Sequence, residues 1–285
     1  MKNKIFAILA VLSLTLCCLA GCGNSKENMR TLPGEILNSE DNFTVITEQV
    51  LEIPRIDEDI YILQGGCVTE EYAWFILTGR NDFGGELYRE AYVIKYDVQT
   101  MEEVSRSGKL LLGHGNDATY VPETNEIYVS HAYMQRVSIL DADTLTVKDV
   151  KKLKMANYAI EYNSSRESFV TANVTLGMAM YDKELKRYNA TLPQDTTLVT
   201  QGICADDKYV YHVLYSQKSN TAEPDNMIFV LDWEGNLITK IPIGLEGCEP
   251  ENISLVGDTF YIGCYNTGIG GGRLFTAKLV KMQSE

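Results

Sequence analysis

The polar side chains with the clearest potential for chemistry begin five similar segments of the chain. Each segment opens with an amide or a carboxylate, continues as an alternating strand and reverses at a polar turn. The five opening residues are Gln64, Asn116, Asn157, Gln201 and Glu251. Gathered at one opening, such groups could hydrogen-bond the hydroxyl, amide or carbonyl groups of a small ligand. The alternative is that they bond the backbone and water inside a narrow polar channel.

A histidine and two carboxylates at these positions raise the question of acid–base catalysis. His114 and Asp117 flank Asn116 in GHGND, and Glu251 lies in EPEN. Glycoside cleavage generally uses two carboxyl groups about 5–10 Å apart, so Asp117 and Glu251 are the candidate catalytic pair. His114 could act on a ligand or simply order its loop. Amides outnumber carboxylates among the five opening residues, which favours binding over catalysis.

A recurring hairpin must position these residues. It is written as VIKYDVQTMEEV, VSILDADTLTVKDV, MAMYDKELKRY and IFVLDWEGNLITKI, and in each copy an aspartate ends the first strand. These aspartates are Asp97, Asp141, Asp182 and Asp232, at spacings of 44, 41 and 50 residues. We expect each to bond the amides of its own turn rather than a metal ion. A period of 40–50 residues with several strands indicates a β-propeller.

A second hairpin precedes each recurring one, so the repeat unit has four strands. We expect five blades, at approximately 64–108, 113–153, 155–195, 201–245 and 248–283. The last blade contains only three strands, whereas FTVITEQVLEIP at 43–54 has no blade of its own. We therefore predict an all-β, five-bladed propeller over 43–285, in which strand 43–54 completes the last blade. Such closure removes exposed sheet edges.

The second blade, EIYVSHAYMQRVSILDADTLTV, resembles a YVTN-type repeat. Over roughly 43–283 the chain is similar to bacterial lipoproteins that carry a YVTN/WD-like β-propeller. More loosely, its blade count and GHGNDATYVPETNEIYV resemble the helveticin-type secreted propellers. The resemblance implies a place at the cell envelope and implies no reaction.

Loop lengths indicate a binding face. The loops between the second and third strands are short in blades two and three and long in blades one, four and five. Blades four, five and one are consecutive in a closed ring, so their loops would gather beside the openings of the inner strands. Clustered loops on a rigid scaffold are where binding usually occurs. Tyr215 and Tyr265 begin two of these loops and could stack on a sugar ring, or they pack against the next blade.

The N-terminus predicts export and lipid attachment. Residues 1–21 combine two lysines with the apolar segment IFAILAVLSLTLCCLA, as in a signal peptide. The segment ends in Leu19-Ala20-Gly21-Cys22, which looks like a bacterial lipobox with Cys22 as the lipid-bearing residue. The alternative is an ordinary signal peptide cut nearby, with Cys22 unmodified. Residues 22–42 are polar and contain Pro33 and Gly34, which predicts a flexible tether.

Lipidation would place the protein on the extracytoplasmic face of the membrane. Stable anchoring requires more than one acyl chain, for example palmitate, and a processed lipobox cysteine would carry at least two. The net charge of −14 becomes −16 when Lys2 and Lys4 are removed with residues 1–21. Such a surface repels nucleic acid and permits Ca²⁺ binding without supporting it. We predict no cofactor.

Four cysteines remain in the propeller: Cys67, Cys204, Cys248 and Cys264. An even number in an exported chain suggests disulfides. However, Cys67 and Cys204 fall in separate blades, and a register with Ser254 opposite Tyr261 offsets Cys248 from Cys264 by about three positions. We therefore expect buried free thiols.

These observations predict a monomeric, membrane-anchored binding module for an envelope glycan, a peptide or an envelope protein. The alternative is a glycan-cleaving hydrolase or lyase. A quinone-dependent dehydrogenase is disfavoured because the chain has only two tryptophans and no evident cofactor clamp.

Overall fold

The computed structural model describes residues 43–79, 90–132, 134–175, 177–191, 198–215, 226–245 and 247–281, together with Pro33 and Leu37. The predicted signal peptide, Cys22 and most of the tether lie outside these residues, as do 80–89 and 216–225 in two of the long loops. Among the described residues, no helix is long and apolar enough to cross a membrane.

The described strands form five antiparallel sheets, which we call blades one to five. Blade one comprises β2 (Ile60–Val68), β3 (Tyr72–Gly79), β4 (Glu90–Asp97) and β5 (Glu103–Arg106), with β6 (Leu110–Leu111) beside β4. Blade two comprises β7 (Asp117–Val121), β8 (Glu126–Ser130), β9 (Met134–Asp141) and β10 (Val147–Asn157). Blade three comprises β11 (Ala159–Asn163), β12 (Ser168–Ala172), β13 (Met178–Asp182) and β14 (Arg187–Ala190).

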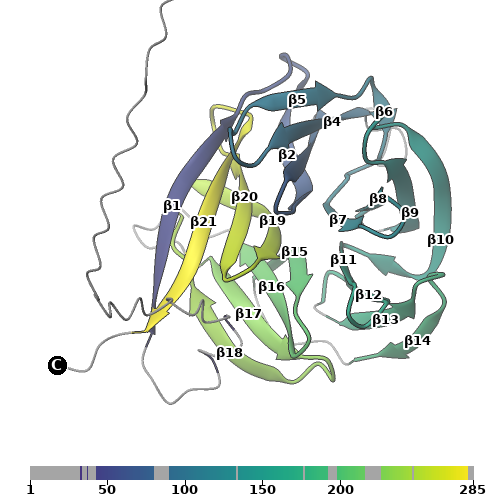
Figure 1. Cartoon of the computed structure of the whole chain (residues 1–285), viewed down its shortest axis with the longest axis vertical. Coiled ribbons are helices and arrows are strands. Elements are labelled where there is room, and N and C mark those ends of the chain that lie inside the picture. Colours follow the sequence, from purple (N-terminus) through teal and green to yellow (C-terminus); the bar gives the residue numbers. More distant parts are fainter. Residues whose placement is uncertain are drawn as a thin grey trace, which may run out of the picture. The chain divides into compact units, whose positions relative to one another are not determined.

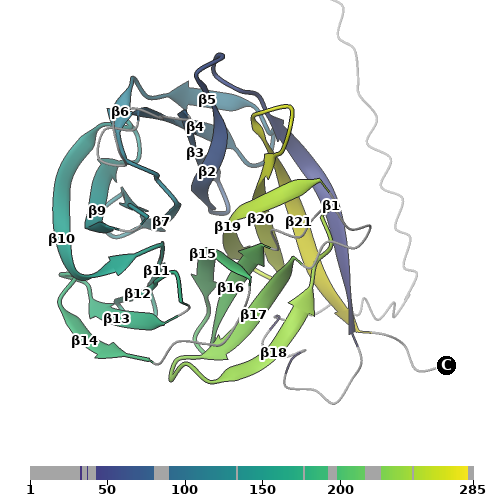
Figure 2. The same cartoon turned by 180° about the vertical axis from the view of Figure 1, so that it is seen from behind.

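Blade four comprises β15 (Val199–Ala205), β16 (Tyr209–Tyr215), β17 (Met227–Asp232) and β18 (Leu237–Pro242). Blade five comprises β19 (Cys248–Val256), β20 (Thr259–Asn266), β21 (Gly272–Lys281) and β1 (Phe43–Ile53). The five sheets surround a common centre, with β2, β7, β11, β15 and β19 innermost (Figures 1 and 2). The predicted all-β, five-bladed propeller is therefore confirmed.

Strand β1 closes the ring as predicted. It pairs antiparallel with β21 from Phe43 opposite Lys281 to Ile53 opposite Gly272, with one register shift near Val50. The last blade thus combines three strands from the end of the described chain with one from its start (Figure 1). This arrangement gives the outer edge of β21 a hydrogen-bonded neighbour.

The hydrophobic core is divided among the five interfaces between blades. Each interface holds its own cluster of buried side chains, contributed by the two facing sheets. Between blades two and three, for example, Tyr128 packs against Phe169 with ring centroids 4.9 Å apart. A single twisted sheet cannot bury both of its faces alone, so every blade depends on both neighbours.

The recurring aspartates have the predicted structural role. The Asp97 carboxylate accepts hydrogen bonds from the backbone N–H groups of Gln99 and Thr100 at 2.9 and 2.8 Å. These bonds, led by the one from Thr100, lower the pKa of Asp97. Equivalent carboxylate–amide bonds are made in their own turns by Asp141, Asp182 and Asp232. The hairpin occurs four times because blades one to four each use this turn to join the third strand to the outer strand.

The four cysteines are buried and free of disulfides, as predicted. Ser254 lies opposite Tyr261, also as predicted, but a register shift between Pro250 and Asn252 places Cys264 opposite Pro250. The offset from Cys248 is therefore two positions rather than three. The two thiols are close enough for a hydrogen bond, which helps to lower the pKa of Cys248 to about 7.

The dipeptides Gln64-Gly65 and Gln201-Gly202 lie where inner strands of neighbouring blades come into contact. A Cβ atom on Gly65 would lie 2.5 Å from the carbonyl oxygen of Gly115, and one on Gly202 would lie 2.6 Å from the Cα atom of Asn252. Both contacts are with backbone, which cannot rotate away as a side chain could. Glycine is thus required for the inner strands to approach closely at these two interfaces.

We expect Gly65→Ala to lower the free energy of unfolding by about 1–3 kcal/mol, because the added methyl group forces β2 away from blade two. The matched control is Gly108→Ala, since a Cβ atom there would meet nothing within 4 Å. Denaturant unfolding of both variants measures the difference. Equal stability of the two variants would contradict the close approach of the inner strands.

Candidate functional site

Side chains at the centre of the ring accept hydrogen bonds from the backbone N–H groups of the inner strands. The inner strand of a blade has no strand on its central side, so its backbone N–H groups there need other acceptors. The hydroxyl of Ser254 in blade five accepts the N–H of Val68 in blade one at 2.9 Å. The hydroxyl of Thr119 in blade two accepts the N–H of Tyr162 in blade three at 3.0 Å. In both cases a blade hydrogen-bonds the next one around the ring.

Glu161 continues this pattern between blades three and four. Its carboxylate accepts the Thr119 hydroxyl at 2.8 Å, and the backbone N–H groups of Tyr162 and Ala205 also favour its charged form. Burial nevertheless outweighs these bonds and raises the pKa of Glu161 to about 8. Glu161 also lines a small cavity of about 290 Å³, beside the turn that joins β7 to β8. Glu161 is not among the predicted site residues, because its strand shows the ordinary alternation of polar and apolar residues.

Asp117 links three blades rather than facing an open site. Its Oδ2 atom accepts the backbone N–H groups of Ile160 in blade three and Ile203 in blade four, both at 3.1 Å. The residue is wholly buried. Burial raises the pKa of Asp117, while the two backbone amides oppose that rise. Its geometry is that of a structural link at the centre of the ring.

Three predicted site residues lie at β-bulges. Between β2 and β3 the register advances by two residues on β2 and by one on β3, and the extra residue is Gln64. The same shift makes Glu251 the extra residue of β19. In β15, Gln201 and Gly202 fall within the corresponding shift. A bulge redirects a side chain out of the regular alternation, and bulges are frequent next to functional sites. We call Gln64, Gln201 and Glu251 the bulge residues.

The bulge residues belong to blades one, four and five, which are neighbours in the ring. All three are buried, with 6%, 3% and 1% of their surfaces exposed. The Gln201 amide donates to Glu249 at 3.1 Å. Gln201 Oε1 and Glu251 Oε2 have no hydrogen-bond partner among the described residues. Burial, followed by the nearby Glu249 carboxylate, raises the pKa of Glu251 well above its usual value.

The other two predicted ring residues differ from the bulge residues. Asn116 precedes β7 and is wholly buried, and neither atom of its side-chain amide has a partner among the described residues. Asn157 is the last residue of β10, where its amide faces the carbonyl oxygens of Met134 and Arg136 at 2.8 and 3.1 Å. Its side chain is thus engaged with β9 in blade two and does not stand with the bulge residues. Asn116 directly precedes β7, and the residue that directly precedes β11 in blade three is Tyr158, one residue later than expected.

The remaining predicted residues are half-buried. The ring centroids of His114 and Tyr158 lie 6.5 Å apart. Tyr215 ends β16 opposite Val199. Tyr265 packs into the hydrophobic cluster between blades five and one, in agreement with the packing alternative. Ligand binding by all of these residues stays a prediction. Within the described ranges, no three His, Cys, Asp or Glu side chains come together as metal ligands.

Comparisons with known proteins support the fold. No family model matches the sequence, and no curated protein matches it. The structure is similar to the crystal structure of glutaminyl cyclase from Myxococcus xanthus, with a TM-score of 0.56 and 9% identity over 85% of this chain and 100% of that chain. At this identity the likeness extends to the fold alone.

Two further matches have lower TM-scores. Hydrazine synthase from Kuenenia stuttgartiensis has a TM-score of 0.43 and 10% identity over 80% of this chain and 65% of that chain. A chain of the mitotic checkpoint complex has a TM-score of 0.45 and 11% identity over 97% of this chain and 99% of that chain.

Asp117 can be tested as a structural link. Asp117→Ala leaves two buried backbone N–H groups without an acceptor, and we expect a loss of about 2–5 kcal/mol in the free energy of unfolding. Asp117→Asn keeps one acceptor oxygen and should lose less than half as much. Denaturant unfolding distinguishes the two variants. If the alanine variant is as stable as the asparagine variant, Asp117 does not hold the blades together.

Glu161 predicts a pH dependence of stability. Its pKa is about 8 in the folded protein and about 4.3 in an unfolded chain, so the folded state binds the proton more tightly. The free energy of unfolding should therefore fall as the pH rises from about 4.5 to 8, by at most about 1.4 kcal/mol per pH unit from this group. Glu161→Gln should flatten that slope in urea unfolding between pH 5 and 9. An unchanged slope would contradict the assignment.

Proposed function

We propose that this protein is a lipid-anchored binding module at the extracytoplasmic face of a bacterial membrane. The order of two lysines, an apolar segment and Leu19-Ala20-Gly21-Cys22 supports lipidation of Cys22. The polar segment 22–42 would then act as a tether between the membrane and the propeller. The strongly acidic composition argues against nucleic acid as the ligand.

The proposed ligand is an uncharged polar group, such as part of a glycan or the backbone of a peptide. The single observation that carries this proposal is the placement of two unpartnered buried oxygens at the bulge residues, one on Gln201 and one on Glu251. Burial and the nearby Glu249 carboxylate raise the pKa of Glu251, which favours the protonated carboxyl, and a protonated carboxyl can donate a hydrogen bond. Gln201 Oε1 can accept one. A hydroxyl or peptide group offers the matching acceptor and donor.

The alternative function, a hydrolase or lyase acting on a glycan, receives less support. It requires Asp117 and Glu251 as a carboxyl pair, but Asp117 Oδ2 already holds two backbone amides. A candidate for the enzyme function would instead be Glu251 with Glu249, which perturbs its pKa. The glutaminyl cyclase of similar fold is an enzyme, yet a likeness of 9% identity assigns no catalytic residue here.

Glu251→Gln is the variant that separates the proposal from its alternative. We expect ligand binding to survive this change, because an amide keeps both a donor and an acceptor. Glu251→Ala and Gln201→Ala should each abolish binding, and Gln49→Ala on the exposed face of β1 is the matched control. The measurement is the thermal unfolding of the full chain in mild detergent against a panel of cell-wall oligosaccharides and short peptides.

A ligand at one hundred times its dissociation constant should add about 2.7 kcal/mol to the free energy of unfolding. No shift with any member of the panel would contradict a small-molecule site at the bulge residues. If the protein chemically converts a panel member and the Glu251→Gln variant does not, the protein is an enzyme rather than a binding module.

A further inference from the structure

A concave surface lies between blades one and two, and none of the bulge residues lines it. It is a cavity of about 680 Å³ beside the turn that joins β2 to β3. Its lining includes three aromatic residues, Tyr72, Trp74 and Tyr120, and three carboxylates, Glu70, Glu71 and Asp143. We call it the blade one–two groove. The function proposed above does not use it.

The aromatic side chains form a rigid row. The Trp74 and Tyr120 rings are stacked at a centroid distance of 5.1 Å and an interplanar angle of 16°, and the Tyr72 ring is tilted at 6.0 Å from Trp74. Trp74 Nε1 donates to the carbonyl oxygen of Ala142 at 3.3 Å. The Tyr120 hydroxyl donates to Asn125 Oδ1 at 3.0 Å. Hydrogen bonds to blade two thus fix both ends of the stacked pair.

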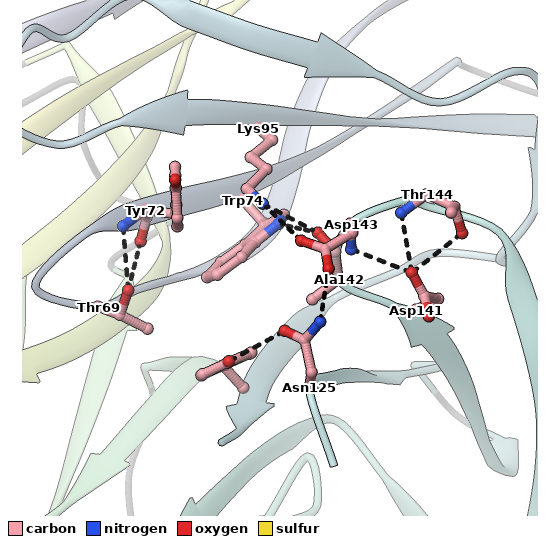
Figure 3. A network of polar contacts seen from close by, with 10 residues as sticks. Thr69, Tyr72, Trp74, Lys95, Asn125, Asp141, Ala142, Asp143 and Thr144 are labelled. Atoms are coloured by element: carbon pink, nitrogen blue, oxygen red, sulfur yellow. Dashed lines mark hydrogen bonds and ion pairs between the residues drawn. The ribbon is translucent and has the colours of Figure 1, made fainter. Parts of the chain in front are cut away.

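The side chain of Lys95 already makes cation–π contacts with this aromatic row. The Lys95 ammonium lies 4.0 Å from the centroid of the Tyr72 ring and 5.4 Å from that of Trp74. It also donates to the carbonyl oxygen of Ala142 and to Asp143, at 3.3 and 3.2 Å (Figure 3). Only 7% of the Lys95 surface is exposed. A buried ammonium persists only where its surroundings compensate the lost hydration, so this environment favours positive charge.

Negative charge remains after Lys95 is accounted for. Three carboxylates line the groove against one ammonium, and Asp143 divides its oxygens between Lys95 and Asn125. Glu70 and Glu71 are exposed at the rim. Ion pairs at such exposed positions contribute about 0.2–1 kcal/mol each. After burial, the carboxylates of Asp143 and Glu71 are the next causes that raise the pKa of Tyr120, which shows that their field reaches the groove.

We propose that the blade one–two groove is a docking site for an arginine- or lysine-bearing segment of a protein partner. A cationic side chain from the partner would lie between Glu70 and Glu71 and above the aromatic row, next to the position that Lys95 occupies. Charge complementarity selects this occupant, since the groove repels anionic glycans and nucleic acid. The surface is distinct from the bulge residues, so either site can fail without the other.

The chain has a built-in reporter for this groove. It contains two tryptophans, and Trp233 belongs to the cluster between blades three and four. Trp233→Phe therefore leaves Trp74 as the only indole. We would titrate this variant of the full chain, in mild detergent, with acetyl-Gly-Arg-Gly-Arg-Gly-amide and follow Trp74 fluorescence. The comparison peptide carries glutamate in place of both arginines.

We expect a saturable change with the arginine peptide, weakened by added salt, and no change with the glutamate peptide. Adding Glu70→Gln and Glu71→Gln should weaken binding about fivefold, as the loss of two exposed ion pairs of about 0.5 kcal/mol each implies. Glu184→Gln with Glu234→Gln changes the net charge equally at other exposed turns and should leave binding unchanged.

Two results would overturn the proposal. One is binding that persists undiminished in the Glu70→Gln, Glu71→Gln variant. The other is the absence of any saturable response to the arginine peptide in a variant whose thermal unfolding matches that of the parent protein. Both glutamates are exposed, so the double variant should fold normally and the comparison remains decisive.

Discussion

The inner strand of each blade presents backbone N–H groups toward the ring centre, where no further strand can pair with them. The rest of the structure depends on how these groups are satisfied. Ser254 and Thr119 each accept an amide of the following blade, and Asp117 accepts amides of two blades at once. Unpaired buried amides would cost about 1–3 kcal/mol each, so these side chains decide whether the ring closes.

This constraint separates structural from functional polar residues. In blades two and three the inner strands are short and regular, and Asp117 and Thr119 of β7 accept backbone amides of other blades. In blades one, four and five a bulge interrupts the inner strand and redirects Gln64, Gln201 or Glu251. Within the described part of the chain, two of the bulged blades supply unpartnered oxygens, on Gln201 and Glu251, and blade two adds the unpartnered amide of Asn116. The long loop predicted for blade five was wrong, because β20 and β21 are joined by residues 267–271, as many as join β12 to β13 in blade three at 173–177. The long loops predicted for blades one and four include 80–89 and 216–225, outside the described residues.

The fold could be predicted because its signals are local. Aspartates such as Asp141 accept hydrogen bonds in turns that recur once in each of four blades. The strand at 43–54 had no blade of its own, and the last blade lacked an outer strand, which β1 supplies. The site was predicted only in part, because register is not visible in a single sequence. The predicted alignment of blade three was wrong by one residue, so Asn157 was assigned the position that Tyr158 occupies. The bulge at Glu251 likewise changed the offset between Cys248 and Cys264 from three positions to two. The groove was missed because Tyr120 joins Trp74 from a different blade.

The most direct test of this account is amide hydrogen exchange at the ring centre. Ile160, Ile203, Tyr162 and Val68 donate to side chains rather than to strands. If those side chains hold the ring closed, their amides should exchange as slowly as the paired amides of β3 and β16, through global unfolding. Exchange at the rate of exposed turns would show that the inner edges are open to water, and would contradict the central role given to Asp117.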